Sequence, residues 1–296
     1  MLMRARGRWN ETKRQSDMKK FTVWMLSLLF LPLMAQANGY TTLWKQVEQW
    51  QAKGQPRSAI NTLQKIVTKA KAEKSYGNLL KAQLSLMAAW DEISPDSLAS
   101  QLQSFKVSAQ RAAQTDKALA AVYNCLLYKG YGEAHRWNRD SMAVANRYKF
   151  LAMTNPAVLA GTKAADYVPL LVEGVDSKYF NNDLLHVIGM EVGDYATLHR
   201  WYDAHDNRSA ACYVALQLLR QTENNASSLA RKSVYLQRLD SLISRYGDLP
   251  IAGELAIARY EFMDGANDVP AREKMSYLNY ALQKWGEWPR MNVLRN

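Results

Sequence analysis

Apolar residues recur along most of this chain at steps of three and four positions, with polar residues between them. Leu43, Val47 and Trp50 share one face of a predicted helix, which the sequence Gly54-Gln55-Pro56 ends. Pro56 can open a second helix because the first helical position needs no N–H donor. The apolar face of that helix is formed by Ala59, Ile60, Leu63, Ile66, Val67 and Ala70. The spacing therefore predicts α-helices rather than strands.

The same spacing predicts three more helices in the following stretch. Ser94-Pro95-Asp96 offers a capping serine, a proline for the first helical position and an acid for the first turn, so it predicts the start of the second of these helices. Their apolar faces are formed by Tyr76, Leu79, Leu80, Leu84, Met87 and Trp90; by Leu98, Leu102, Phe105, Ala109 and Ala112; and by Leu119, Val122, Tyr123, Leu126 and Leu127.

The predicted helices come in pairs, which open near Tyr40, Tyr76 and Asp116, at offsets of 36 and 40 residues. Helix pairs repeated every 34 to about 40 residues are typical of tetratricopeptide-like arrays. One pair cannot bury both of its apolar faces alone, so neighbouring pairs stack. The predicted fold class is all-α, a tetratricopeptide-like solenoid of antiparallel helix pairs.

The C-terminal part repeats this pattern, and the middle does not. A helix rich in leucine leads to the break Arg245–Pro250, an alanine-rich helix follows, and Ala271–Trp285 closes the series. Residues 154–183 hold only short apolar pieces between prolines, glycines and asparagines. We therefore expect a first helical array at 38–154, an irregular connector at 155–182 and a second helical array at 183–296.

Residues 18–37 have the order of a secretory signal peptide. Lys19 and Lys20 precede an apolar run from Phe21 to Met34, and Ala35-Gln36-Ala37 follows it. The run is too short to span a bilayer, and cleavage after Ala37 would give a mature chain with no transmembrane segment. Residues 1–17 are interpreted as a start assigned too early, or a disordered extension. The prediction is a periplasmic or secreted protein, without the cleavage-site cysteine that a lipid anchor requires.

The charge of the chain does not indicate a nucleic-acid partner. The formal net charge is +11, but residues 1–20 carry seven Lys/Arg and two Asp/Glu. The remainder carries 31 basic and 25 acidic residues, a net charge of +6. Basic and acidic residues are interspersed, as in Lys65–Lys74, which indicates a solvated helix face rather than a phosphate-binding footprint.

The sequence contains two cysteines, Cys125 and Cys212. Both lie in apolar helical runs, where cysteine commonly acts as a small hydrophobic residue. A disulfide between them is permitted outside the cytoplasm, but one distant pair does not require it.

The four histidines, His135, His186, His199 and His205, form no metal-binding pattern. His199 and His205 are six residues apart, so they do not share a helix face as metal ligands four residues apart do. Asp264 and Asp268 flank a turn whose order differs from that of a calcium loop. The sequence predicts no metal site.

Two glycine-containing segments resemble phosphate-binding loops only in part. Gly130-Tyr131-Gly132 lacks a preceding strand and a third glycine, so we expect a helix terminator there. Gly161-Thr162-Lys163 lacks the upstream glycine of a phosphate loop. No nucleophile motif is present, and we expect no catalytic residues, no cofactor and no enzymatic activity.

Tryptophans are plentiful, and most are expected to wedge between helices, although some could line a groove for a peptide or glycan. They include Trp44, Trp50, Trp90, Trp137, Trp201, Trp285 and Trp288.

Two segments resemble bacterial alpha-2-macroglobulin-family proteins, in the exported form whose N-terminal region is helical. Residues 40–75 (YTTLWKQVEQWQAKGQPRSAINTLQKIVTKAKAEKS) show a tryptophan-bearing helix, a Gly-x-Pro break and a helix of the same pattern as that region. Residues 180–189 (FNNDLLHVIG) resemble a later stretch of it. The resemblance covers nearly all of the predicted mature chain, but it rests on packing and turn residues.

The resemblance implies a role beside a protease trap, in which a bait segment is cut and a Cys-x-Glu-Gln thioester captures the protease. Neither Cys125 nor Cys212 is followed by Glu-Gln at that offset, and no series of β-sandwich domains is present, so no trapping residue is carried over. We expect a noncatalytic exported helical scaffold of an alpha-2-macroglobulin-like protease inhibitor. Its partner would be downstream macroglobulin domains or a protease. The alternative is an independent tetratricopeptide-like envelope module that binds peptides or glycans.

Overall fold

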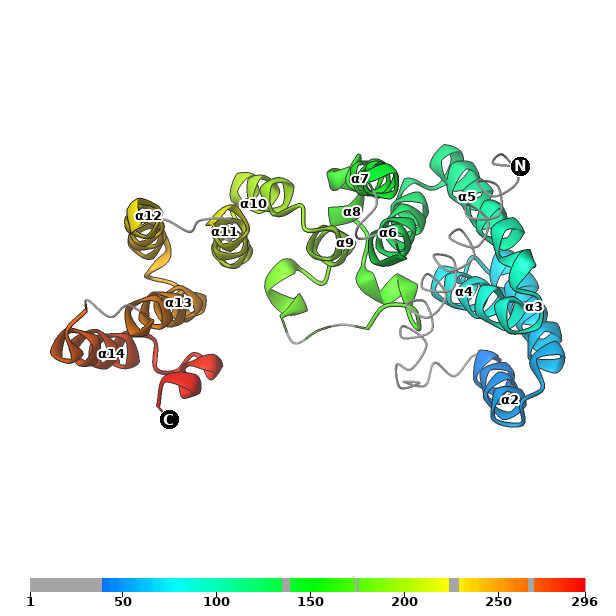
Figure 1. The fold of residues 1–296 in the computed structure, drawn as a ribbon, viewed down its shortest axis with the longest axis horizontal. Helices are drawn as coiled ribbons and strands as arrows, with labels where there is room; N and C mark the ends of the chain where they lie inside the picture. Colours follow the sequence, from blue (N-terminus) through cyan, green and yellow to red (C-terminus); the bar gives the residue numbers. More distant parts are fainter. Residues whose placement is uncertain are drawn as a thin grey trace, which may run out of the picture. The chain divides into compact units, whose positions relative to one another are not determined.

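The computed structural model describes residues 39–134, 139–172, 174, 176–223, 229–265 and 269–295. These residues form helices joined by turns, and no strand occurs among them (Figure 1). The all-α fold class is therefore confirmed. The predicted signal segment at 18–37 and the extension at 1–17 lie outside the described residues. No described helix combines the length and the apolar character needed to cross a bilayer.

The chain divides into two compact units, which are considered separately here. Unit 1 contains the described residues up to Ser177 together with Asn181–Gly193, and unit 2 contains Lys178–Phe180 and the described residues from Asp194 onward. The α-helices of unit 1 are α2 (Tyr40–Ala52), α3 (Pro56–Ala72), α4 (Tyr76–Ile93), α5 (Leu98–Thr115), α6 (Lys117–Ala134), α7 (Arg139–Ala152), α8 (Pro156–Ala160) and α9 (Leu184–Val192). Those of unit 2 are α10 (Tyr195–Ala204), α11 (Arg208–Glu223), α12 (Leu229–Tyr246), α13 (Gly253–Asp264) and α14 (Ala271–Trp285).

Short 3-10 helices occupy much of the region between and beside these helices. They are η2 (Pro95–Ser97), η3 (Ala164–Tyr167), η4 (Ser177–Phe180), η5 (Pro250–Ala252) and η6 (Pro289–Leu294). Three of the short elements, α8, η3 and η4, fall in the stretch for which the sequence predicted an irregular connector. Helices α2, α3, α4 and α14 begin at the residues where the pattern placed them, at Tyr40, Pro56, Tyr76 and Ala271.

Two local predictions are wrong. Pro95 opens the 3-10 helix η2 instead of α5, which begins at Leu98, because the Ser97 hydroxyl and N–H both bond the Ser94 carbonyl and close a tighter turn first. Gly130-Tyr131-Gly132 does not end a helix but lies inside α6. There the neighbouring helices α5, α7 and α9 pack around α6, which offsets the weak helical preference of glycine.

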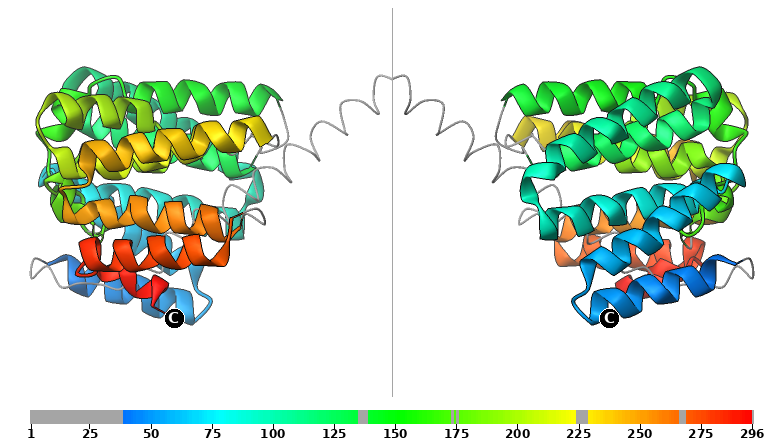
Figure 2. Two further views of the ribbon diagram at one scale, coloured as in Figure 1. Left: turned by 90° about the vertical axis from the view of Figure 1, so that its left-hand side faces the viewer. Right: turned by 90° about the vertical axis from the view of Figure 1, so that its right-hand side faces the viewer.

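The first helices of unit 1 pack in the order in which they occur along the chain, α2 on α3 and α3 on α4 (Figure 2, right). Their shared core contains Trp44 and Val47 of α2 and Leu63 and Ile66 of α3, all at most 4% exposed. The Trp44 indole N–H donates to Asn78 Oδ1 on α4 at 2.8 Å, so the one polar atom of this ring is satisfied inside the core.

Helix α4 is covered on a further side by η3. A Cβ atom built on Gly77 would lie 2.3 Å from the carbonyl oxygens of Tyr167 and Val168, so only glycine lets this backbone lie against the helix. The rings of Tyr76 and Tyr167 stack beside this approach, with centroids 6.1 Å apart. The rest of unit 1 packs around α6, where Tyr123 meets Phe105 of α5 edge to face.

Unit 2 is closed by segments from both ends of its sequence. Phe180 is fully buried and meets the rings of Tyr202 and Tyr213 edge to face. At the other end, Trp288 lies against Gly253, where a Cβ atom would be 2.8 Å from the indole. The tryptophan ring also contacts Tyr179, with centroids 5.5 Å apart, so η4 lies beside the segment that precedes η6.

Candidate functional site

Each histidine that the structure describes has a local structural contact rather than a shared site. His199 Nε2 lies 3.3 Å from the Tyr246 hydroxyl, and His205 Nδ1 lies 2.8 Å from the Trp201 carbonyl oxygen. His186 follows Asp183, which caps α9 by accepting the His186 backbone N–H, and burial lowers the pKa of its imidazole to about 4. His135 lies outside the described residues. These contacts do not bring the histidines together.

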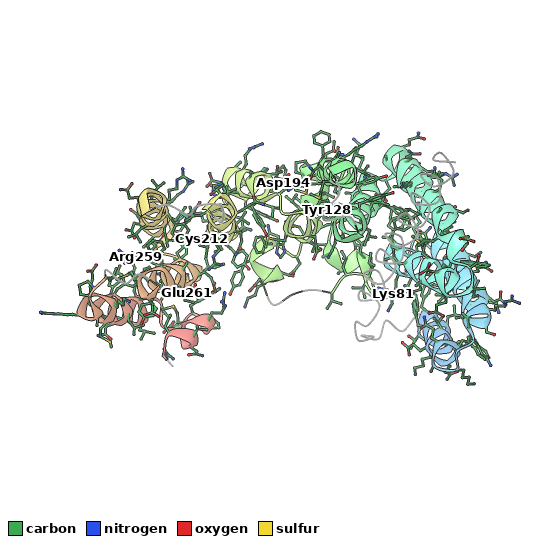
Figure 3. All side chains as sticks on the ribbon, in the orientation of Figure 1. Lys81, Tyr128, Asp194, Cys212, Arg259 and Glu261 are labelled. Carbon is green, nitrogen blue, oxygen red and sulfur yellow. The ribbon has the colours of Figure 1, made fainter. Side chains whose placement is uncertain are left out.

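Cys125 and Cys212 are both free and buried, one in unit 1 and one in unit 2. Burial raises the pKa of each thiol to about 12, so the reactive thiolate is disfavoured at both positions. Figure 3 labels Cys212 on α11. The two cysteines therefore form no disulfide in this structure. Each is buried as a small hydrophobic residue, which is the role that the sequence indicated.

The remaining polar motifs also serve local structure. The Thr162 hydroxyl donates to the Val158 carbonyl at 2.8 Å, and Lys163 donates to the Asn181 carbonyl at 2.8 Å. Asp264 is the last residue of α13 and lies 3.7 Å from the Lys274 ammonium, while Asp268 lies outside the described residues. Within the described ranges, no three His, Cys, Asp or Glu side chains gather as metal ligands.

Three of the tryptophans are buried, with the indole N–H engaged. Besides Trp44, the Trp285 N–H donates to the Gly247 carbonyl at 3.2 Å and the Trp288 N–H donates to Glu254 Oε1 at 2.8 Å. Their rings are therefore part of the helix packing and are not exposed to a glycan. Trp50, Trp90 and Trp201 are half-buried, and Trp137 lies outside the described residues.

A polar cluster that sequence reasoning missed lies at the end of unit 2. Glu254 is only 3% exposed, and it accepts hydrogen bonds from the Trp288 indole and from Arg290 Nη1 at 2.5 Å. Because the partners are 34 and 36 residues further along the chain, no local pattern reveals the contact. Both carboxylate oxygens are used, so this buried acid holds the C-terminal segment in place rather than offering a reactive group.

Exposed apolar side chains follow one another along α7 and α8. Phe150 is 71% exposed, although the opposite side of α7 packs closely through the fully buried Ala145 and Ala152. We call the α7–α8 face the set of exposed residues Met142, Val144, Phe150, Leu151 and Val158. On α7, Met142 and Val144 lie about 160° apart around the helix, and the exposed Asn146 and Arg147 lie between the apolar positions. Phe150 is therefore the main apolar protrusion of this face rather than part of one continuous patch. Exposed aromatic rings are enriched at protein interfaces.

Comparison of the chain with protein-family models, with curated proteins and with solved structures finds no match in any of the three. The resemblance given above therefore remains a prediction. The geometry shows packed helices with exposed faces, in which the described cysteines are buried and the described histidines and Glu254 are held by contacts within the fold.

Proposed function

We propose that this chain is a noncatalytic helical scaffold that docks a protein partner. In our proposal the scaffold is exported and serves an alpha-2-macroglobulin-like protease inhibitor, either by holding the macroglobulin domains or by contacting the protease. The observation that carries the proposal is the strongly exposed ring of Phe150 on the α7–α8 face, on a fold whose described histidines, cysteines and buried Glu254 are engaged in packing. The resemblance of residues 40–75 supports the assignment to this kind of inhibitor.

We further propose that the helix pairs form a tetratricopeptide-like solenoid. Most of the helix packing is between sequence neighbours, which is the arrangement of such arrays.

Site-specific photo-crosslinking tests the docking proposal. A benzophenone amino acid replaces Phe150 in the full chain, expressed in its own cells, and the crosslinked products are identified by mass spectrometry. The control carries the same group at Met275 on α14, which is 57% exposed and lies outside the α7–α8 face. We expect position 150, but not position 275, to crosslink to a polypeptide with macroglobulin domains or to a protease. Identical products from both positions, or none of these partners from position 150, would contradict the proposal.

The competing proposal is an envelope module that binds peptides or glycans through its aromatic rings. The half-buried Trp201 is the strongest candidate, but its ring already stacks on His205, with centroids 4.0 Å apart. A peptide and glycan array separates the two proposals. A scaffold gives no saturable binding of small ligands, whereas saturable binding lost on Trp201→Ala would favour the module.

A further inference from the structure

The positive charge of the chain is concentrated on its first described helix pair. Residues 40–75, which form α2 and α3, contain seven Lys/Arg and two Asp/Glu, a net charge of +5. Residues 76–296 contain 24 Lys/Arg and 23 Asp/Glu, a net charge of +1. The net charge of the described helices is therefore carried almost entirely by α2 and α3 and the residues that join and follow them.

These cations are exposed, and most of them make no ion pair with another described residue. Lys69 is the exception, because its ammonium lies 2.6 Å from Glu73 and over the ring of Tyr40. We call the cationic face the six exposed and unpaired residues Lys45, Lys53, Arg57, Lys65, Lys71 and Lys74. Because these six side chains form no ion pair with another described residue, their charges are available to an external anion.

The exposed side of α3 carries no acid that would neutralise this charge. At 100° per residue, its outward positions fall within roughly a third of the helix circumference. Those positions are Arg57, Asn61, Gln64, Lys65, Thr68 and Lys71. Arg57, Lys65 and Lys71 lie on this one side of α3, so a planar anionic surface could meet all three of them at once.

The residue types on this face favour a fluid lipid surface over a protein or a nucleic acid. Five of the six cations are lysine. Lysine is a strongly hydrated point charge, whereas arginine is the residue preferred for bidentate recognition of carboxylates and phosphates and is enriched at protein interfaces. Polybasic lysine clusters are typical of electrostatic attachment to anionic lipids.

An aromatic side chain lies at one end of the cationic face. Trp50 is half-buried near the end of α2, and the Lys53 ammonium lies 5.2 Å from its ring centroid. Tryptophan beside lysine is characteristic of the interface between lipid headgroups and acyl chains, where the ring reaches the apolar side and the ammonium stays with the phosphates.

We propose that the cationic face of α2 and α3 binds the surface of an anionic phospholipid bilayer. Each lysine or arginine near such a surface strengthens binding by roughly fivefold, and the attraction weakens with salt. Lipid binding by the cationic face does not depend on the scaffold function or on the α7–α8 face. The lipid proposal can therefore fail while the scaffold proposal holds, and the reverse is also true.

Vesicle co-sedimentation tests this proposal with two variants matched in charge. The test variant, Arg57→Gln/Lys65→Gln/Lys71→Gln, removes three cations from the exposed side of α3. The control variant, Arg111→Gln/Arg200→Gln/Arg272→Gln, removes three exposed cations from other helices, none of which forms an ion pair with a described residue. All proteins are produced from the full sequence, and their N-termini are determined by mass spectrometry, so that residues 1–38 contribute equally to each.

We expect the unsubstituted protein and the control to bind phosphatidylcholine vesicles that contain phosphatidylglycerol more strongly than phosphatidylcholine vesicles. The test variant should bind the anionic vesicles on the order of 100-fold more weakly. Equal loss in both variants, or no preference for anionic vesicles, would overturn the proposal. Competition with the vesicles by duplex DNA or by a poly-glutamate peptide, at equal charge concentration, would also overturn the proposal. It would show that the cationic face binds a different polyanion. Circular dichroism of both variants confirms that they are folded.

Discussion

The first helix pair and unit 2 treat their charged side chains in opposite ways. In unit 2 four arginines form ion pairs: Arg208 with Asp248, Arg245 with Asp203, Arg259 with Asp240 and Arg290 with Glu254. Arg200 and Arg272 are exposed there without an ion pair to a described residue. On α2 and α3 only Lys69 has a carboxylate partner among the described residues, and the other cations are exposed. The difference is that ion pairs within the fold engage several cations of unit 2, whereas most cations of α2 and α3 have no such partner among the described residues. The predictions below test this contrast and the packing around it.

The largest effect is expected for Trp288→Ala. The substitution empties the space beside Gly253 and leaves the buried Glu254 without its indole donor, so the free energy of unfolding should fall by about 3–5 kcal/mol. Urea denaturation followed by circular dichroism measures it. Trp50→Ala is the control on α2, where the half-buried ring packs less completely, and we expect less than half of that loss.

Acid should destabilise unit 1 through His186. The imidazole has a pKa of about 4 in the folded chain, lowered by burial, and about 6.5 when unfolded, so the unfolded state binds more protons between these values. Stability should therefore fall as pH falls from 6.5 toward 4, by up to about 3 kcal/mol. The test is urea unfolding as a function of pH for the unsubstituted chain and for His186→Gln.

His186→Gln should flatten this part of the pH profile, because the side chain no longer titrates. His205→Gln is the matched control, since this exposed imidazole bonds only the Trp201 carbonyl at 2.8 Å. A pH profile that His186→Gln leaves unchanged would contradict the assignment of this loss of stability to the buried imidazole.

Arg259→Met should have an intermediate effect. The Arg259 guanidinium donates to Asp240 at 2.6 Å and lies 4.4 Å from the ring centroid of Tyr277, so it joins α12, α13 and α14 (Figure 3). Losing the charge-assisted hydrogen bond and the ring contact should cost about 1–3 kcal/mol. Lys65→Met on α3 has no such partner and should change stability by less than about 0.5 kcal/mol. Equal losses from both substitutions would remove the distinction between the two regions.

The smallest effect is expected for Arg208→Ala. Its guanidinium makes a bidentate pair with Asp248, at 2.6 and 2.9 Å, but both side chains are about half exposed. Solvent screening should keep the loss in stability smaller than that of Arg259→Met, and added salt should reduce it further. Thermal unfolding at low and high ionic strength measures this difference, and a loss larger than that of Arg259→Met would reverse the expected order.

Periodicity predicted much of the helical architecture because apolar spacing is a local property. Pro56 and Tyr76 start their helices where the pattern placed them, and α14 spans the predicted Ala271–Trp285. The apolar pattern did not predict features that depend on contacts between residues far apart in the sequence. Gly130 lies within α6 because other helices surround it, and no sequence rule links Glu254 to Trp288 and Arg290.

The candidate surfaces were less accessible to sequence reasoning. The spacing of Lys69 and Glu73, four residues apart on a helix, suggests their ion pair, but the exposure of Lys65 and Lys71 follows from how α3 packs. The exposure of Phe150 likewise follows from the side on which α7 packs, which spacing alone does not specify. Spacing predicts which residues share a face, but the packing partner decides which face is covered.

Hydrogen–deuterium exchange with and without anionic vesicles tests the contrast between the two regions most directly. We expect phosphatidylglycerol-containing vesicles to slow exchange in peptides from residues 40–75 and to leave peptides from α10 to α14 unchanged. Protection in unit 2 with none in α2 and α3, or no protection in either, would contradict the account.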